Sequence, residues 1–471
     1  MSENHSSSSL YEREITPVER LFTRHPFAIV TMVARIRGNV TGHMVRGAVS
    51  KVRQRHPNLR VRIVEDEIGN PWLTSEGAEE IPVETVPRES GDHWIRVVQE
   101  SCQIPFDFEA RPAIRFILVQ SASISELVIL CHHILCDGLS LAYLARDLMV
   151  HLGDPDREVE VLPDPVPIGL GSFPEGVSAN AVVRFFINRM NRKWEAEKVV
   201  FDQEDYQSLH SAYWMSYQHQ MLSVELSEAQ TSALVDSCRS EGVTVNSALS
   251  AAFVGAQTII QGERLFPTSI LVAGNLRDRL KSPAGEVMGF YAGGVTPKWR
   301  YNPGRWFWEN ARDFQRKVRP LYRDKHLFQE PLTWSHLDPT ILEAMTFKMF
   351  GGLIPEGSSR YQKISAFRAR NDTVQSILKR EKMDSLDGVI IGTAVTNLAR
   401  LDFPCECGAL ELDRLIMKPG GVFPLSKFNL VLGAVTCAGK LSLVLEFVEN
   451  NVGVGTMEEI NDKALQFLLS E

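Results

Sequence analysis

Residues 127–138, with the sequence LVILCHHILCDG, decide the fold of this chain. The first five are apolar and rich in branched side chains, which predicts a buried strand. Two histidines end that strand, and an Asp–Gly pair comes just before a helical pattern over residues 139–152. A strand, a short loop and a helix in this order indicate a mixed α/β fold.

The two histidines are expected to have different roles. Adjacent side chains on a strand point to opposite faces, so we expect His132 to pack inward and His133 to face a channel. A neutral imidazole can take a proton from an attacking hydroxyl or amine and return it to a leaving group. Asp137 either orients that imidazole or pairs with an arginine, and Gly138 leaves room for a ligand or backbone to approach.

Two other interpretations of this stretch stay open. On a helix, His133 and Asp137 would share a face as metal ligands, but the preceding strand and Gly138 argue against a helix there. No third ligand is near in sequence, so we predict no metal site. The other interpretation is structural, with two hydrogen-bonded histidines and an Asp–Gly turn that caps the next helix. From the segment alone, it is as good as the catalytic one.

Composition restricts the classes of function. The chain has 471 residues and a formal net charge of −8, which argues against a nucleic-acid partner. No run reaches the roughly 18–20 apolar residues of a membrane span, and residues 2–9 are polar and serine-rich, unlike a signal peptide. The seven cysteines include no C-x-x-C pair. We therefore expect a cytoplasmic protein without a membrane span, acting as a monomer.

The expected elements divide the chain into two mixed α/β halves. Residues 1–11 are expected to be a disordered lead, 12–152 the N-terminal subdomain, the proline-rich 153–176 a linker, and 177–471 the C-terminal subdomain. In the first half we expect helices from a capping box at residues 16–19 and at 42–55, 94–102 and 139–152, and strands at 26–36, 59–64, 113–119 and 127–132. In the second half we expect helices at 179–196, 227–241, 246–260, 305–318, 339–350 and 457–469, and strands at 221–226, 268–273, 287–295, 388–396, 409–417, 428–435 and 441–447. Two similar halves predict a cleft between them, a favoured place for a ligand.

Residues 132–138 have the pattern H-H-x-x-x-D-G, which resembles the signature of the chloramphenicol-acetyltransferase-like superfamily of acyltransferases. That superfamily includes condensation domains, polyketide-associated acyltransferases and alcohol acetyltransferases. Other segments are similar to family segments in the same order: 15–22 (ITPVERLF), 55–62 (RHPNLRVR), 105–118 (PFDFEARPAIRFIL), 272–279 (VAGNLRDR) and 289–294 (GFYAGG). Residues 395–398 (VTNL) resemble the S-N-x-G segment of the alcohol acetyltransferase branch.

The resemblance implies a fold of two subdomains, each a mixed sheet with flanking helices, meeting in a V with a central tunnel. It also implies that His133 is the catalytic base and that Asp137 supports the site, paired with Arg60. His132 and Gly138 would be further structural support. Thr396 and Asn397 would line the oxyanion site or the tunnel wall. No cofactor would be bound permanently, and the donor would be acyl-CoA or a phosphopantetheinyl carrier protein.

Two departures from the family pattern reduce the number of reactions to be expected. The D-F-G-W-G segment of condensation domains is absent around residues 424–432 (PLSKFNLVL), and Ala399 replaces a usual glycine, so that turn is expected to differ. We therefore favour transfer of an acyl group from a thioester to a hydroxyl, in secondary or lipid metabolism. An amide-forming stand-alone condensation enzyme and a catalytically silent carrier-protein-binding module are the alternatives, and the intact H-H-x-x-x-D-G argues against the silent one.

Overall fold

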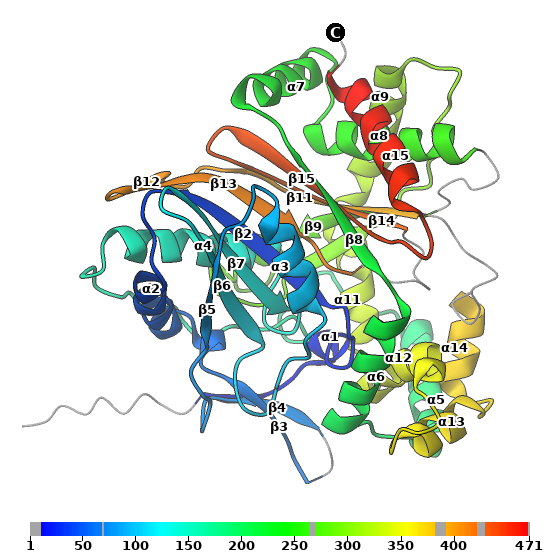
Figure 1. Cartoon of the computed structure of the whole chain (residues 1–471). Coiled ribbons are helices and arrows are strands. Elements are labelled where there is room, and N and C mark those ends of the chain that lie inside the picture. The colour runs from blue at the N-terminus through cyan, green and yellow to red at the C-terminus, as the bar shows by residue number, and fades with distance from the viewer. Residues whose placement is uncertain (1–10, 68–69, 263–268, 382–391, 422–428, 470–471) are drawn as a thin grey trace, which may run out of the picture.

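A computed structural model describes residues 11–67, 70–262, 269–381, 392–421 and 429–469. Its strands form two six-stranded sheets and one three-stranded sheet (Figure 1). Helices flank both large sheets, so the expected architecture of two mixed sheets with flanking helices is confirmed. The proposed disordered lead, apart from Tyr11, lies outside the described residues.

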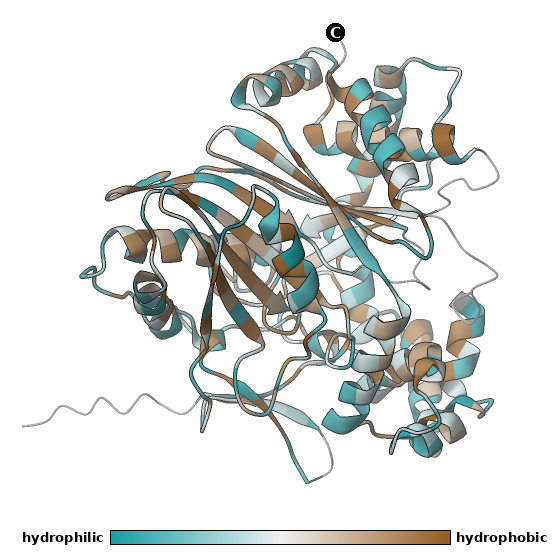
Figure 2. Ribbon diagram, in the orientation of Figure 1, coloured by the Kyte–Doolittle hydropathy of each residue, from teal (hydrophilic) through white to brown (hydrophobic). Residues whose placement is uncertain are grey.

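The first large sheet contains the strand that ends in the two histidines. Its order is β12-β13-β2-β7-β6-β5. The bounds are β2 Ile29–Arg37, β5 Val83–Pro87, β6 Ile114–Gln120, β7 Ile124–His132, β12 Glu406–Cys407 and β13 Leu410–Lys418. β7 pairs antiparallel with both β2 and β6, and nearly all of its residues are buried. Its central place explains the unbroken apolar run, and Figure 2 shows hydrophobic residues along the strands of this sheet.

β12 and β13 belong to the first sheet although they come from the second half of the sequence. β13 pairs antiparallel with β2, from Glu411 opposite Arg37 to Lys418 opposite Thr31. Residues 406–418 therefore complete the sheet of the N-terminal subdomain, and the linear boundary predicted at 153–176 does not separate the two sheets. Periodicity predicted this strand but carries no information about its neighbour.

The second large sheet has the order β10-β9-β11-β14-β15-β8. The bounds are β8 His219–Glu225, β9 Ser269–Asn275, β10 Ala292–Val295, β11 Gly392–Leu401, β14 Leu430–Cys437 and β15 Lys440–Val448. β11 runs parallel to β9 and β14, and the other pairs are antiparallel. The sheet is therefore mixed, as the sequence predicts.

A small sheet and a capped turn form the start of the described chain. The sheet has the order β1-β4-β3, with bounds β1 Glu12–Glu14, β3 Arg62–Glu65 and β4 Pro71–Thr74. The predicted capping box is confirmed, because Thr16 Oγ1 accepts from the Glu19 N–H and the Glu19 carboxylate accepts from the Thr16 N–H at 2.9 Å. The helix that begins at this capping box is short, with bounds α1 Pro17–Arg20.

The helices form three groups. Around the first sheet lie α2 Gly42–Arg55, α3 His93–Cys102 and α4 Gly138–Gly153; beside the second lie α7 Glu228–Ser240, α8 Val245–Gln261, α9 Phe307–Val318 and α15 Val454–Leu469 (Figure 1). The third group has its own aromatic core and comprises α5 Ala181–Glu195, α6 Gln203–Ser216, α12 Pro339–Phe350, α13 Tyr361–Arg368 and α14 Thr373–Glu381. Two short helices are α10 Asp324–Leu327 and α11 Gln329–Trp334.

Within the described residues, no single helix has both the length and the apolar composition that crossing a membrane requires. Helices α7 and α8 have them only when taken together, and the chain bends by 97° at the break between these two helices.

Candidate active site

The loop between β7 and α4 is held at both ends. The His133 N–H donates to the Ala28 carbonyl at 2.9 Å, which continues the pairing of β7 with the segment before β2. At the other end Asp137 is the N-cap of α4, and its Oδ1 accepts from the Ser140 N–H at 2.7 Å and from Ser140 Oγ at 2.8 Å. The loop therefore presents His133 in one fixed position.

The imidazole of His133 is set up to accept a proton at Nε2. Its Nδ1 lies 3.2 Å from the Cys136 carbonyl oxygen, which can only accept, so the tautomer with hydrogen on Nδ1 satisfies this contact and leaves the lone pair on Nε2. The Pro419 carbonyl is a second backbone acceptor at the ring. The ring stacks on Phe22 at 4.9 Å between centroids and meets the edge of Phe290 at 5.5 Å. Burial lowers the pKa of His133, while the carbonyl of Cys136 acts in the opposite direction. The half-buried ring is therefore neutral at pH 7.

His132 lies inside the core. Its side chain is fully buried, and its ring meets Phe108 edge-on at 5.1 Å. Burial lowers the pKa of His132 to about 3, so it stays neutral at physiological pH. The structure thus separates the two histidines as the alternation of a strand requires, with His133 toward the exposed side.

Asp137 pairs with Arg277, and the predicted partner Arg60 is wrong. Arg277 Nη2 lies 2.9 Å from Asp137 Oδ1, and the Tyr291 N–H donates to Asp137 Oδ2 at 3.0 Å. Arg60 instead follows the short 3-10 helix Pro57–Leu59 and lines a surface pocket. The family resemblance suggested Arg60, whereas the partner comes from the segment after β9 in the second half.

Both Nη atoms of Arg277 and both carboxylate oxygens of Asp137 have hydrogen-bond partners, while Nε of Arg277 is buried without one among the described residues. Burial alone would raise the pKa of Asp137, but the Arg277 guanidinium and the hydrogen bonds from Ser140 outweigh it, so the pKa is below its usual value. Arg277 also donates from Nη1 to the carbonyls of Gly285 at 3.0 Å and Val287 at 2.7 Å. The Asp137 carboxylate therefore accepts from Arg277, Ser140 and the Tyr291 N–H. The group that contacts His133 Nδ1 is the Cys136 carbonyl.

Arg277 is the site residue that sequence reasoning missed. It lies within 272–279 (VAGNLRDR), a segment noted for its resemblance to a family pattern without a role for its arginine. The signal that could have found it is an arginine placed just after a buried strand, since a fully buried arginine needs an acidic partner.

Gly138 makes room for protein side chains. A Cβ built on it would lie 2.7 Å from Met417 Sδ and 3.0 Å from Leu398 Cδ2. These side chains come from β13 and β11, so the first turn of α4 packs closely against both large sheets. The atoms that come close to Gly138 thus belong to two side chains, whereas the sequence pattern predicted a ligand or backbone there.

The structure separates Thr396 from Asn397. By the alternation of β11, Thr396 and Asn397 point to opposite faces of the strand. Leu398, which lies beside Gly138, comes where the register of β11 against β14 shifts. Asn397 lines a pocket of about 590 Å³ and its Oδ1 accepts from the Ala399 N–H at 2.8 Å. Ala399 has φ of 61°, so the turn keeps a left-handed conformation that favours glycine.

A second buried polar cluster joins the two large sheets. Lys418 Nζ of β13 lies 2.6 Å from Glu446 Oε1 of β15, and both side chains are almost fully buried. His219 of β8 lies 3.9 Å from the same carboxylate oxygen and bonds to Tyr213 Oη at 2.6 Å. The signal in the sequence is a charged residue next to an apolar run in each of two strands, Lys418 after LIM and Glu446 after LVL.

The His, Cys, Asp and Glu side chains bear on whether the chain has a metal site or a disulfide. Within the described ranges, no three His, Cys, Asp or Glu side chains are grouped closely enough to hold a metal ion. All seven cysteines have free thiols, and all but Cys405 are buried. The segment equivalent to D-F-G-W-G, around 424–432, lies largely outside the described residues.

Two parts of the sequence match family models. Residues 12–152 match the condensation domain, and residues 216–296 match the C-terminus of phthiocerol/phthiodiolone dimycocerosyl transferase. Nonribosomal peptide synthetase agiA of Aspergillus flavus is 30% identical over 117 residues. That match covers 24% of this chain and 2% of the synthetase.

Solved structures resemble nearly the whole chain. Polyketide synthase associated protein 5 from Mycobacterium tuberculosis has a TM-score of 0.58 at 16% identity, over 98% of both chains. TRI3 trichothecene 15-O-acetyltransferase from Fusarium sporotrichioides has a TM-score of 0.63 at 12% identity, over 99% of this chain and 97% of that one. The first condensation domain of the calcium-dependent antibiotic synthetase has a TM-score of 0.57 at 14% identity, over 95% and 91%. At this level of identity the likeness shows the fold alone, and the chain has the fold of these structures.

Proposed function

We propose that this chain is an acyltransferase that moves an acyl group from a thioester to a hydroxyl acceptor, with His133 as the general base. The observation that carries the proposal is the Nδ1 contact of His133 with the Cys136 carbonyl, which leaves Nε2 as the accepting nitrogen. A lowered pKa keeps that nitrogen unprotonated near neutral pH. The matches to condensation and dimycocerosyl transferase models support a thioester as donor.

The proposed reaction is a direct transfer. His133 Nε2 takes the hydroxyl proton while the oxygen attacks the thioester carbonyl carbon. The new C–O bond gives a tetrahedral intermediate, which collapses by breaking the C–S bond. The thiolate takes the proton from the imidazolium, so an ester and a free thiol leave and neutral His133 is restored.

The developing oxyanion needs hydrogen-bond donors. We assign Thr396 as a candidate, because it lies on β11 two residues before Leu398, the side chain that lies against Gly138. A donor of this kind contributes about 3–4 kcal/mol to lowering the barrier. Replacing Thr396 with Val should therefore lower kcat with little change in KM for the donor.

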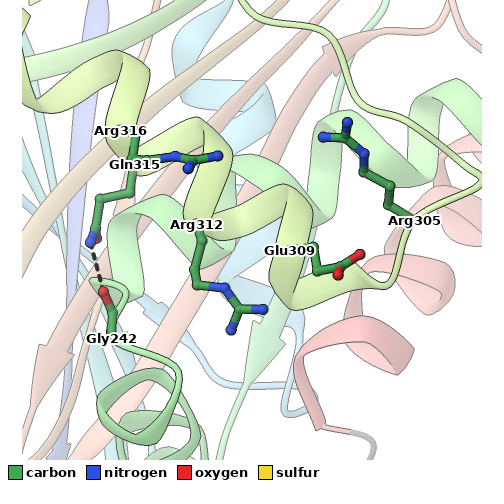
Figure 3. A pocket seen from close by; sticks show the side chains of 6 residues that line it. All are labelled: Gly242, Arg305, Glu309, Arg312, Gln315 and Arg316. Atoms are coloured by element: carbon green, nitrogen blue, oxygen red, sulfur yellow. Dashed lines mark hydrogen bonds between the residues drawn. The ribbon is translucent and has the colours of Figure 1, made fainter.

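The donor is proposed to approach along the second sheet. The pocket that contains Asn397 lies between the start of α8, the ends of β9 and β11, and α9. Gln315 lines both this pocket and a neighbouring one of about 600 Å³ that contains Arg305, Arg312, Arg316 and Glu309 (Figure 3). Guanidinium groups suit phosphate, which both CoA and a phosphopantetheinyl carrier protein possess.

The test is a transfer assay with defined donors. The purified chain is incubated with acyl-CoAs of increasing length, or with an acylated carrier protein, with and without alcohols, and free thiol and ester are measured. Thiol release that depends on the alcohol and is lost in His133→Ala supports the proposal. If His133→Ala stays within a few-fold of the wild type, the assigned role of His133 is wrong.

An amine acceptor is the second candidate, favoured by the similarity of part of the chain to a nonribosomal peptide synthetase. The same assay with amines separates the two, because amide and ester products differ in stability to hydroxylamine. A chain that binds a carrier protein but transfers nothing from any donor would instead be a silent binding module. We further propose a cytoplasmic monomer in secondary or lipid metabolism, and the mass of the chain in solution tests the oligomeric state.

A further inference from the structure

Helix α5 exposes a dense group of large apolar side chains. Val182, Phe185 and Phe186 are 64%, 59% and 63% exposed, and Val183 is 40% exposed. All four lie in the first two turns of the helix. Exposed apolar residues are ordinary when scattered, but a contiguous group marks a surface that meets another apolar phase.

The rest of α5 is fixed to the protein, so this group is held away from it. Trp194 is buried and its Nε1 donates to Thr340 Oγ1 at 2.8 Å. Asn191 Nδ2 donates to the His336 carbonyl at 2.9 Å, and its Oδ1 accepts from the Asp338 N–H at 3.0 Å. Ile187 is also buried and lies about two helical turns before Trp194, on the same face. The inward face is therefore already used, and the apolar group lies on the outward face.

The outward face changes from apolar to cationic along the helix. Residues three or four positions apart share a face of a helix, which places Val182, Phe185 and Phe186 in line with Arg189 and Lys193. From Phe186 to Lys193 the rise is about 10 Å. The first two turns present the apolar side chains, and the following two turns present the cations.

The charge of α5 is opposite to that of the chain. Four cationic side chains against one acidic residue give the helix a net charge of +3, from Arg184, Arg189, Arg192, Lys193 and Glu195. The whole chain has a formal net charge of −8. A local cationic face on an acidic protein directs this one surface toward an anionic partner.

We propose that α5 binds the surface of an anionic membrane. The apolar first turns would enter the boundary between headgroups and acyl chains, to the depth of about 5–10 Å that interfacial helices reach. Arg189, Arg192 and Lys193 would then lie at the level of the acidic headgroups. The proposed donor pockets contain no residue of α5, so this surface is distinct from the catalytic site.

The test is co-sedimentation of the full chain with vesicles. Vesicles of equal parts phosphatidylserine and phosphatidylcholine should bind the wild type, and vesicles of phosphatidylcholine alone should bind it much less. Binding should fall with added salt. The double variants Phe185→Ser/Phe186→Ser and Arg189→Glu/Lys193→Glu should each lower the bound fraction about tenfold or more.

A matched control keeps the test specific. Ile104→Ser/Leu170→Ser removes two apolar side chains that are 54% and 58% exposed elsewhere, and it should bind vesicles like the wild type. Circular dichroism and transfer activity in solution should be unchanged in all variants. No binding to either vesicle would overturn the proposal. A wild-type dimer that Phe185→Ser/Phe186→Ser dissociates, or a carrier protein that needs these two residues while vesicles do not bind, would overturn it too.

Discussion

The two large sheets are equal in strand number but unequal in what they contribute to the candidate site. Strand β7 of the first sheet leads directly into the loop that contains His133, whose Nδ1 contacts the Cys136 carbonyl. The segment that connects β9 and β10 of the second sheet contributes Arg277 and the Tyr291 N–H. Both donate to the Asp137 carboxylate and so hold the loop. A reactive side chain from one sheet is thus positioned by the other, and changes on the two sides should differ in kind.

The largest expected effect is on the first sheet, at His133. His133→Ala should lower kcat by roughly 10²–10⁴, the usual contribution of a general base. The unfolding midpoint should change little, because the ring is half-buried and its Nδ1 contact is with its own loop. Acceptor-dependent thiol release and urea unfolding measure the two quantities. A large loss of stability together with activity would make His133 a structural residue.

The second sheet should show the reverse pattern. Arg277→Met leaves the buried Asp137 carboxylate without its partner and should lower the free energy of unfolding by about 3–5 kcal/mol. The double variant Asp137→Asn/Arg277→Met should lose less than the sum of the two single changes. Urea unfolding measures all three.

Arg60 provides the control for that prediction. It has no assigned role in holding Asp137, so Arg60→Met should change stability by about 0.5 kcal/mol or less. If Arg60→Met were as damaging as Arg277→Met, the assignment of the ion pair would be wrong.

Acid should affect activity and stability through different histidines. Burial lowers the pKa of His133, so kcat/KM should fall on the acid side, as Nε2 becomes protonated, at a lower pH than for a free imidazole. Burial lowers the pKa of His25 to about 4 and of His132 to about 3. The unfolded chain binds those protons near pH 6.5, so stability should be lost as pH falls from about 6.5 toward 4.

Replacing one buried histidine checks the stability half of this prediction. His132→Gln removes the titrating group and should flatten the fall of the unfolding midpoint between pH 6.5 and 4. The pH at which kcat/KM falls on the acid side should be the same as in the wild type. A change of that pH in His132→Gln would mean that His132 influences the protonation of His133.

A small gain in stability is expected in the turn of the second sheet. Ala399 has φ of 61°, a conformation that costs an alanine about 1 kcal/mol relative to glycine. Ala399→Gly should therefore raise the free energy of unfolding by up to about 1 kcal/mol without changing kcat. A loss of stability would mean that the alanine methyl group is needed in the turn.

Local features were predicted well because their causes are local. The capping box at Thr16, the bounds of α2 and the buried run of β7 depend on residues within about one or two turns of each other. Helix α6 was missed because Tyr206, Leu209 and Tyr213 are interspersed with polar residues that hide the apolar period. Its stability comes from the aromatic core it shares with α12 and α13.

By itself, the sequence determined the mixed α/β class and the two different histidines, and it pointed to His133 as the base. Alternation on a strand and the order of short segments carry that information. The tertiary structure alone decided that Arg277 holds Asp137, that β13 joins β2, and that Asn397 lines a pocket with residues of α8 and α9. Partners of a buried charge or a strand edge are set by the packing of distant segments, and no local period records them.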